Sequence, residues 1–316
     1  MIAGIVGFGS AGSRHAQILA SRGFSVVAVR SFQGPTKRPL PFGYSQVATV
    51  GELIEMKPVL AVVSTPTLHH FSDALELASG AVPVLIEKPL ISVEDRLQEL
   101  NDICLSNKVP IRVAYHLRFH PIFRYIHQAL SARQSKILSI RAAWGEYLPD
   151  WHPDEDFRLS YAARSDQGGG PLLTLSHVVD YAVHISGPAV ETRLLRTNHG
   201  ILSIDTEETA MLGIRHLSGS LSSIQLDYLT RPTRHHVEVV YDKGVITYDF
   251  QRDIMIHDRL ESVEEVVNFG KPSSLRQACF DSQIDDFLNR IEIGLYGLDN
   301  HDLTVSHLLL ELYQSL

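Results

Sequence analysis

The sequence of 316 residues has little cysteine, little tryptophan and no long apolar run. Its two cysteines, Cys104 and Cys279, argue against a disulfide framework and against a cysteine-based zinc site. No stretch is long and apolar enough to span a bilayer. Basic residues are not in excess either, because the net charge is −8 at pH 7, and an acidic balance argues against nucleic-acid binding. We therefore expect a globular protein with no nucleic-acid or membrane partner.

The N-terminus also lacks the basic and apolar regions of a secretory signal, because its first apolar residues are typical of a strand. We therefore expect a cytoplasmic protein. Its length and its 44% hydrophobic content allow two domains, each with its own core.

Residues 1–119 alternate short apolar segments with amphipathic ones, which is the pattern of βαβ units and a parallel sheet. The predicted strands are Ile2–Val6, Ser25–Val29, Leu60–Ser64, Val82–Ile86 and Pro110–Ala114. The predicted helices are Ser13–Ser21, Val50–Met56, Thr67–Ser79 and Val93–Asn107. The fold class is therefore α/β, with an N-terminal Rossmann domain, a doubly wound parallel sheet, over residues 1–119.

Residues 120–316 have a different rhythm of longer strand-like runs framed by helices. The predicted strands are Ile137–Tyr147, Thr209–Ile214, Gly219–Tyr228, His236–Tyr241 and Gly244–Phe250, and the predicted tail helices are Leu275–Ile293 and Leu303–Leu312. We expect a second, α+β domain with an open, mostly antiparallel sheet.

A GxGxxG turn follows the first predicted strand. Its first glycine, Gly7, permits the tight turn, Gly9 lets the backbone approach a pyrophosphate, and Gly12 allows a helix to pack closely on the strand. The start of that helix attracts phosphate. A chance glycine loop is the alternative, but strand, glycines, helix and strand occur in the order that a dinucleotide site requires. The predicted contacts of this turn are Gly7, Phe8, Gly9, Ser10, Ala11 and Gly12.

The end of the second predicted strand lacks the acidic residue that would bind the ribose hydroxyls of NAD. Arg30 and Ser31 stand there instead, with Lys37 and Arg38 nearby in sequence. A guanidinium and a hydroxyl suit a 2′-phosphate, so we expect NADP to be preferred to NAD. The alternative is that Arg30 is a solvated charge and that NAD binds without an acidic partner.

Two more polar segments follow predicted strands, where a doubly wound sheet presents its ligands. The first contributes Ser64, Thr65, Pro66 and His70, and the second contributes Glu87 and Lys88. Pro89 disfavours helix at Lys88 and so displays an ammonium at the rim of the sheet. By itself, the second segment is more often the surface end of a strand. We expect these six residues to contact the cofactor.

The order of the motifs resembles the family of glucose-fructose oxidoreductase, inositol dehydrogenase and MocA (Gfo/Idh/MocA), and the likeness covers nearly the whole chain. The motifs are GFGSAG, STPTLHH, IEKPL, the junction Tyr115–Pro121, the glycines 168–170 that lead into Leu172–Asp180, and a late helix over Phe280–Leu288. The resemblance implies a nucleotide-binding domain, then an open sheet that often mediates oligomerisation. It also implies hydride transfer between a nicotinamide and a hydroxyl-bearing carbon of a sugar or polyol.

The same resemblance implies catalytic roles for Lys88 and His177. The ammonium of Lys88 would stabilise a developing alkoxide, and the imidazole of His177 would exchange a proton with the hydroxyl. Thr174 stands where the family has an aspartate, and it cannot ionise at neutral pH. On one helix Thr174, His177, Tyr181 and His184 would share a side. Buried polar groups of a core are the alternative, and we expect no metal site.

A segment rich in aromatic and charged residues, Trp144–Trp151, precedes the glycines. Aromatic faces beside Arg and Asp suit a carbohydrate, although Trp144 alone could be a core residue of an alternating strand. A weak likeness points to a bacterial subgroup in surface-polysaccharide and sugar-nucleotide pathways. The expected substrate contacts are Lys88, Tyr115, Arg118, Trp151, Arg158, Tyr161, Arg164, His177 and Tyr181.

Together these patterns predict an NAD(P)-dependent oxidoreductase acting on a sugar, a sugar acid or a sugar nucleotide. An NAD-dependent glycoside hydrolase or eliminase of the same fold, and a nicotinamide-binding regulatory protein without turnover, are the alternatives. A pure carbohydrate-binding protein is the least favoured, since it would not need Lys88 beside a dinucleotide fold. We also expect a homodimer or homotetramer through the C-terminal sheet, because apolar residues would otherwise be exposed there. Those residues are Leu221, Ile224, Leu226 and Tyr228.

Overall fold

The computed structural model describes residues 1–30, 39–91, 96–131, 134–260 and 262–315, which form two compact units. The first unit contains residues 1–115, 166–168 and 281–316, and the second contains residues 116–165 and 169–280. The expected boundary at residues 119/120 lies close to the observed one in the first half of the chain. The expectation assigned all later residues to the second domain, whereas the last 36 residues, 281–316, group with the first unit.

The first unit is built on a six-stranded sheet in the order β3-β2-β1-β4-β5-β6, and all of its neighbouring strands are parallel. Its strands are β1 (Ile2–Val6), β2 (Ser25–Val29), β3 (Ser45–Val47), β4 (Leu60–Val63), β5 (Val84–Glu87) and β6 (Ile111–Ala114). This order is that of a doubly wound dinucleotide-binding sheet and confirms the predicted fold. The carboxyl ends of β1, β4 and β5 lie at one edge, where ligands of such sheets bind.

Helices alternate with the strands along the first unit. The predicted helix Thr67–Ser79 consists of two elements, the 3₁₀ turn η1 and then α3. The elements are α1 (Ser10–Ser21), α2 (Val50–Glu55), η1 (Thr67–His69), α3 (His70–Ser79), α4 (Leu97–Ser106) and α9 (Asn300–Gln314). Helix α8 (Pro272–Glu292) begins in the second unit and ends in the first.

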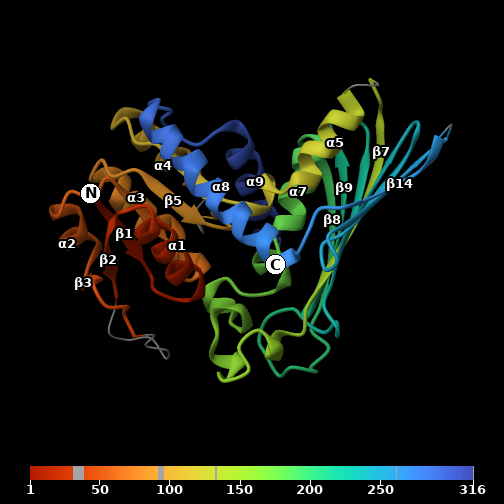
Figure 1. Ribbon diagram of the computed structural model, residues 1–316. Coiled ribbons are helices and arrows are strands. Elements are labelled where there is room, and N and C mark those ends of the chain that lie inside the picture. Colours follow the sequence, from red (N-terminus) through yellow and green to blue (C-terminus); the bar gives the residue numbers. More distant parts are fainter. Residues whose placement is uncertain (31–38, 92–95, 132–133, 261, 316) are drawn as a thin grey trace. The chain divides into compact units, whose positions relative to one another are not determined.

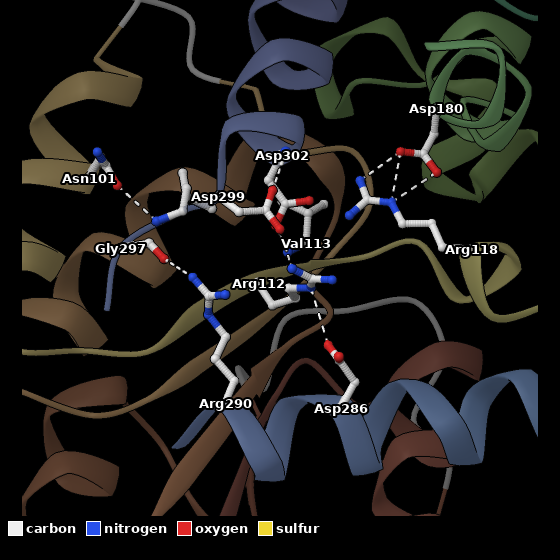
Figure 2. Close-up of polar contacts among 11 residues, drawn as sticks. Asn101, Arg112, Val113, Arg118, Asp180, Asp286, Arg290, Gly297, Asp299 and Asp302 are labelled. Atoms are coloured by element: carbon white, nitrogen blue, oxygen red, sulfur yellow. Dashed lines mark hydrogen bonds and ion pairs between the residues drawn. The ribbon is translucent and has the colours of Figure 1, made fainter. Parts of the chain in front are cut away.

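Ion pairs explain why the C-terminal segment belongs to the first unit. Arg22, at the end of α1, donates to Asp285 at 2.8 Å and to Asp281 at 3.1 Å, and both carboxylates are on α8. Arg112 on β6 pairs with Asp286 on α8 and with Asp299, the N-cap of α9 (Figure 2).

Backbone contacts add to this attachment. Asp302 in the first turn of α9 is fully buried and accepts a hydrogen bond from the backbone N–H of Val113 at 3.1 Å (Figure 2). Asn101 on α4 accepts from the backbone N–H of Leu298 at 2.8 Å. The sequence separations of 189 and 197 residues show why local patterns did not reveal this return of the chain.

The second unit is built on an eight-stranded sheet in the order β14-β13-β12-β11-β7-β10-β9-β8. Neighbouring strands are antiparallel except for β7 and β10, which are parallel, so the sheet is mostly antiparallel as predicted. Its strands are β7 (Ile137–Gly145), β8 (Ala189–Thr197), β9 (Thr209–His216), β10 (Leu221–Asp227), β11 (Arg234–Tyr241), β12 (Gly244–Asp249), β13 (Ile254–Arg259) and β14 (Ser262–Asn268).

Helices lie along one face of this sheet, as Figure 1 shows for α5 and α7. The α-helices between η2 and β8 are α5 (Pro121–Ser131), the four-residue α6 (Pro171–Thr174) and α7 (His177–Ser186). The 3₁₀ turns are η2 (His116–Phe119), η3 (Leu148–Asp150), η4 (Phe157–Leu159), η5 (Tyr161–Ala163) and η6 (Ser165–Gln167).

The alternation along β9 and β10 separates a covered face from an open one. Of the residues expected to form an exposed patch, Ile224, Leu226 and Tyr228 are instead buried, at most 1% exposed, and that part of the expectation is wrong. Only Leu221 is exposed, at 54%. Successive side chains of a strand point to opposite faces, so Leu221 lies on the other face from Ile224 and Leu226. The helices cover the face that carries Ile224 and Leu226. Within the described ranges, no helix combines the length and the apolar character that crossing a membrane requires.

Candidate active site

The glycine turn between β1 and α1 has the geometry that a dinucleotide needs. Gly7 has a φ of +86°, and a Cβ there would lie 2.7 Å from the carbonyl oxygen of Ser64. A Cβ on Gly12 would overlap the carbonyl oxygen of Gly7. A Cβ on Gly9, by contrast, would meet nothing within 4 Å. Two glycines are therefore required by packing, and the third leaves open space beside the start of α1, where a pyrophosphate fits.

The turn after β4 is joined to the glycine turn. The hydroxyl of Ser64 donates to the carbonyl of Gly7 at 2.7 Å. The hydroxyl of Thr65 donates to the carboxylate of Asp73 on α3 at 2.6 Å, and burial raises the pKa of that carboxyl. Both residues, predicted to contact the cofactor, thus also hold the loop beside it, and Pro66 follows as the N-cap of η1.

Glu87 and His70 are buried behind the rim of the sheet. The Oε1 atom of Glu87 lies 2.8 Å from Nε2 of His15 on α1, and Oε2 accepts from the backbone N–H of Lys88 at 3.2 Å. His70 is 2% exposed and contacts two backbone carbonyls. The sequence prediction counted both residues as cofactor ligands, whereas these contacts brace the turns. His15 was missed, because a histidine inside an amphipathic helix carries no local signal of its partner 72 residues away.

Arg30, predicted to bind a 2′-phosphate, is half-buried at the end of β2. Its guanidinium carbon lies 5.9 Å from the centre of the Phe8 ring, within the glycine turn, so the cation lies over an aromatic face. Tyr44 approaches the same ring edge-on at 6.3 Å. Ser31, Lys37 and Arg38, the other parts of that prediction, lie outside the described residues.

His177 begins α7 in the second unit and is surrounded by rings. The ring of His116 meets it edge-on at 4.5 Å, and the ring of Trp144 lies 6.0 Å away at an angle of 27°. His116 in turn stacks on Phe280 at 4.0 Å. His177 is 2% exposed. His116 was not predicted to contribute, although it lies inside the junction motif Tyr115–Pro121.

Thr174 does not share a helix with His177. Helix α6 ends at Thr174 and α7 begins at His177, so the predicted polar stripe is broken. The Thr174 hydroxyl donates to the carbonyl of Gly170 at 2.8 Å and lies 2.5 Å from the hydroxyl of Tyr228. Tyr181 is stacked on Phe250, and burial raises its pKa well above the usual value. The continuous stripe was therefore wrong, because the chain leaves the α-helical conformation at Leu175, between the two helices.

Arg118, expected to contact substrate, forms a buried ion pair. Its Nε donates to both carboxylate oxygens of Asp180, at 3.0 and 3.1 Å, and a terminal nitrogen donates at 2.6 Å (Figure 2). The Arg118 side chain is 8% exposed and that of Asp180 is 1% exposed. Asp180 lies one turn after His177, so this pair ties η2 to the beginning of α7. Tyr115, the residue before η2, is 1% exposed and lies in the first unit.

Several of the residues that were expected to contact a carbohydrate form contacts within the protein instead. Trp151 packs against a small core around Leu148 and Tyr228, with its ring edge-on to Tyr228 at 5.6 Å. Arg158 pairs with Asp156 at the surface. Tyr161 is 37% exposed and Arg164 is half-buried. Trp144 stacks face to face on His235 at 4.0 Å. Trp151 is thus held by packing against this core, and Arg158 is held by a surface ion pair.

Lys88 lies in the first unit and His177 in the second, and each is described within its own unit. Among the residues that the structure describes, no group of three or more His, Cys, Asp or Glu side chains has the arrangement of a metal site.

Comparison with known proteins assigns the first unit. Residues 1–115 match the model of an oxidoreductase family with an NAD-binding Rossmann fold, GFO_IDH_MocA. Residues 1–115 are thus similar to the NAD-binding domain of this oxidoreductase family. An uncharacterized oxidoreductase of Synechocystis sp. is 23% identical over 207 residues, which are 61% of this chain and 55% of that protein. The chain thus matches about half of the length of this curated relative.

Solved structures show a likeness in fold that covers the whole chain. Levoglucosan dehydrogenase in complex with NADH and levoglucosan has a TM-score of 0.82 at 16% identity, covering 100% of this chain and 95% of that one. UDP-N-acetylglucosamine 3-dehydrogenase of Acidithiobacillus ferrooxidans has a TM-score of 0.76 at 17% identity, covering 100% and 97%. At these identities the comparison establishes the fold.

Proposed function

We propose that this protein transfers a hydride between a nicotinamide cofactor and the hydroxyl-bearing carbon of a sugar, a sugar acid or a sugar nucleotide. Lys88 and His177 act on the reacting oxygen. The glycine turn that fits a dinucleotide supports the cofactor, and the family supports the reaction class. The two structures of similar fold are named as dehydrogenases of an anhydrosugar and of a sugar nucleotide, which supports a carbohydrate substrate.

The observation that carries the proposal is the glycine turn between β1 and α1. Gly7 and Gly12 leave no room for a Cβ, whereas Gly9 leaves open space beside the start of α1. The hydroxyl of Ser64 bonds the turn after β4 to this loop. Lys88 follows β5 at the same edge of the sheet, where ligands of doubly wound sheets bind.

The two side chains supply complementary chemistry. A bound nicotinamide would supply the hydride acceptor. The hydride would carry both electrons of the C–H bond away from the carbon. The imidazole of His177 takes the hydroxyl proton and returns it in the reverse reaction. The ammonium of Lys88 stabilises the negative charge that develops on oxygen, and it is held at the end of a buried strand. The carbon is thereby oxidised from alcohol to carbonyl.

The cofactor is NADP in this proposal. Arg30 lies beside Phe8 at the end of β2, where NAD-specific sites carry an acidic residue. A guanidinium there can make bidentate, charge-assisted contacts with a 2′-phosphate. NAD remains the family's broader expectation, since the matched family is described as NAD-binding.

The test is a panel of sugars, sugar acids and sugar nucleotides, supplied with oxidised NADP or NAD, with the formation of reduced nicotinamide followed by fluorescence. We expect turnover with at least one carbohydrate and loss of turnover in Lys88→Met. Product formed without net reduction of the cofactor would support instead a hydrolase or eliminase with transient oxidation. Cofactor binding with no turnover on any member would support a regulatory protein, for which Thr174 in place of an acid is the favouring observation.

We also propose that the open face of the eight-stranded sheet pairs with a second copy of the chain. Leu195 and Met211 are directly opposite each other on β8 and β9 and are 71% and 48% exposed. Leu221 is exposed on the same face. Light scattering at micromolar concentration should show a dimer or tetramer, and the double change Leu195→Glu and Met211→Glu should dissociate it. Leu260→Glu, at an exposed hairpin, is the control, and a monomeric wild-type chain would refute this assembly.

A further inference from the structure

His70 bridges two turns at the rim of the first sheet. It is the first residue of α3 and is 2% exposed. Its Nε2 lies 2.7 Å from the carbonyl oxygen of Thr65, in the turn after β4. Its Nδ1 lies 2.9 Å from the carbonyl oxygen of Pro89, in the turn after β5. One buried ring thus contacts both turns that the sequence analysis assigned to the cofactor.

The two turns are the ones whose relative position matters for chemistry. The first turn is bonded to the glycine turn through Ser64 and to α3 through Thr65. The second turn carries Lys88, directly before Pro89. A ring that joins them therefore ties the backbone beside Lys88 to the turn that is bonded to the glycine loop.

The chemistry of the two contacts is restrictive. A carbonyl oxygen can only accept a hydrogen bond, so each ring nitrogen must carry a hydrogen for both contacts to be hydrogen bonds. A neutral imidazole carries one such hydrogen and an imidazolium carries two. The bridge is therefore complete only when His70 is protonated, and one contact is lost when the proton leaves.

Groups around His70 act in opposite directions on its proton. Burial is the largest effect and lowers the pKa of His70 below its usual value, although the two carbonyl contacts and the carboxylates of Glu87 and Asp73 act in the opposite direction. Glu87, at the end of β5, is itself paired with His15 of α1, and Asp73 is on α3. His69 precedes the ring and is exposed.

We propose that His70 is a positioning residue, which holds the turn bearing Lys88 against the Ser64–Pro66 turn through both of its ring nitrogens. The proposal rests on the proposed catalytic role of Lys88, and it gives His70 a role through its contacts with the backbone of the two turns. When one ring nitrogen loses its hydrogen, its hydrogen bond to the carbonyl of one turn is lost. The position of the turn that carries Lys88 therefore depends on the protonation of His70.

The first experiment needs no substrate. In the full chain labelled with ¹³C and ¹⁵N, the ring of His70 and the carbonyl carbons of Thr65 and Pro89 are followed by NMR as the pH is raised. We expect one of the two carbonyl signals to shift with the same midpoint as the ring. His70→Phe should abolish this shift, and His69→Phe, the exposed neighbour, should preserve it. Two carbonyl signals indifferent to the titration of His70 would overturn the proposal.

The second experiment separates this proposal from the proposed function. With a substrate from the panel, His70→Phe should lower turnover by about 10-fold to 10²-fold, as expected for a misplaced catalytic group. His70→Gln, which keeps one donor, should retain more turnover, and thermal unfolding checks that both variants fold.

In a Lys88→Met background, His70→Phe should have little further effect, because it acts through the same group. Additive losses would show that His70 acts elsewhere. A Lys88→Met variant with normal turnover would instead contradict the proposed function, while the NMR titration would still report on the bridge.

Discussion

The two units hold their proposed catalytic groups by different kinds of contact. Near Lys88, polar side chains from helices hold the rim of the sheet by hydrogen bonds. His70 contacts two backbone carbonyls, and His15 contacts the carboxylate of Glu87. Around His177, rings are packed against rings. His116 lies edge-on to it, and Trp144 is stacked on His235, which in turn stacks on Phe250 at 3.9 Å.

The difference follows from the two architectures. At the carboxyl edge of a parallel sheet the chain turns repeatedly, so backbone carbonyls and N–H groups are buried there and require hydrogen-bonding partners. On the covered face of an antiparallel sheet the ladder satisfies the backbone, and the inward side chains at every second position are free to be large rings. Each fold therefore immobilises a catalytic side chain with the interaction that its backbone leaves available.

The buried pair Arg118–Asp180 is a polar contact within the ring-rich second unit, and breaking it should give the largest effect. Asp180→Asn leaves a buried guanidinium without its charged partner and should lower the free energy of unfolding by about 3–5 kcal/mol. Urea unfolding measures it. Asp156→Asn, which removes the exposed partner of Arg158, is the matched control and should leave the midpoint nearly unchanged. Equal midpoints for both variants would show that rings alone hold α7.

Substitutions of Lys88 and His177, the two proposed catalytic groups, test whether both act in the same reaction. Lys88→Met and His177→Asn should each lower turnover by about 10²-fold or more, because each removes a group that stabilises charge or moves a proton. Affinity for the cofactor, measured by fluorescence titration, should change little.

Thr174→Ala is the control for this pair. Its hydroxyl is bonded to Gly170 and Tyr228, so its loss should cost much less turnover than loss of His177. Near-normal turnover in His177→Asn would eliminate the proposed proton carrier, and an equal loss in Thr174→Ala would give the threonine a larger role.

Arg30 tests whether the first unit also recognises its ligand through charge. Arg30→Ala should weaken NADP(H) binding by about 1.5–3 kcal/mol, as for the loss of a charged hydrogen bond, and should leave NAD(H) binding nearly unchanged. Fluorescence titration with both cofactors measures the difference. Arg158→Ala, at the surface of the second unit, controls for the loss of one positive charge. Equal affinities of the wild type for the two cofactors would contradict the NADP preference.

The pH dependence of stability tests whether the stacked His235 ring stabilises the second unit in its neutral form. Burial lowers its pKa well below the usual value, so the folded ring stays neutral while the unfolded ring binds a proton. Stability should therefore be lost as the pH falls below about 6.5, at up to about 1.4 kcal/mol per pH unit for one proton. His235→Phe preserves the stacked shape and should reduce this slope in urea unfolding. His236→Phe, the exposed neighbour, should not, and an unchanged slope in both variants would contradict the argument.

Much of the first unit was predictable because its signals are local. The bounds of β1 and β2 match the predicted strands, and the glycine turn has the expected positive φ at Gly7. In the second unit, β8, β13 and β14 were missed. Strand β8 carries charged residues on a face that is open to solvent, so the strand lacks a strict apolar alternation. Its place in the sheet comes from pairing with β9 over Ala189–Thr197.

The candidate site shows the same division. Lys88 and His177 were found through motifs, whereas the partners that hold them were not. Trp151 was expected to face a carbohydrate and packs into a core, and Arg118 was expected to face substrate and pairs with Asp180. The residue type alone does not show whether a side chain contacts a ligand or packs inside the protein. Its neighbours in space decide this.

The sequence by itself determined the strands and the turn whose requirements lie within a few residues, such as the left-handed φ of Gly7 and the apolar run of β1. It also determined which residues could carry charge or protons. The tertiary structure decided where α6 ends, which unit holds the last helix and which histidines contact the backbone. The physical reason is that buried polar groups and rings must find partners, and those partners come from distant segments, as Glu87 does for His15 across 72 residues.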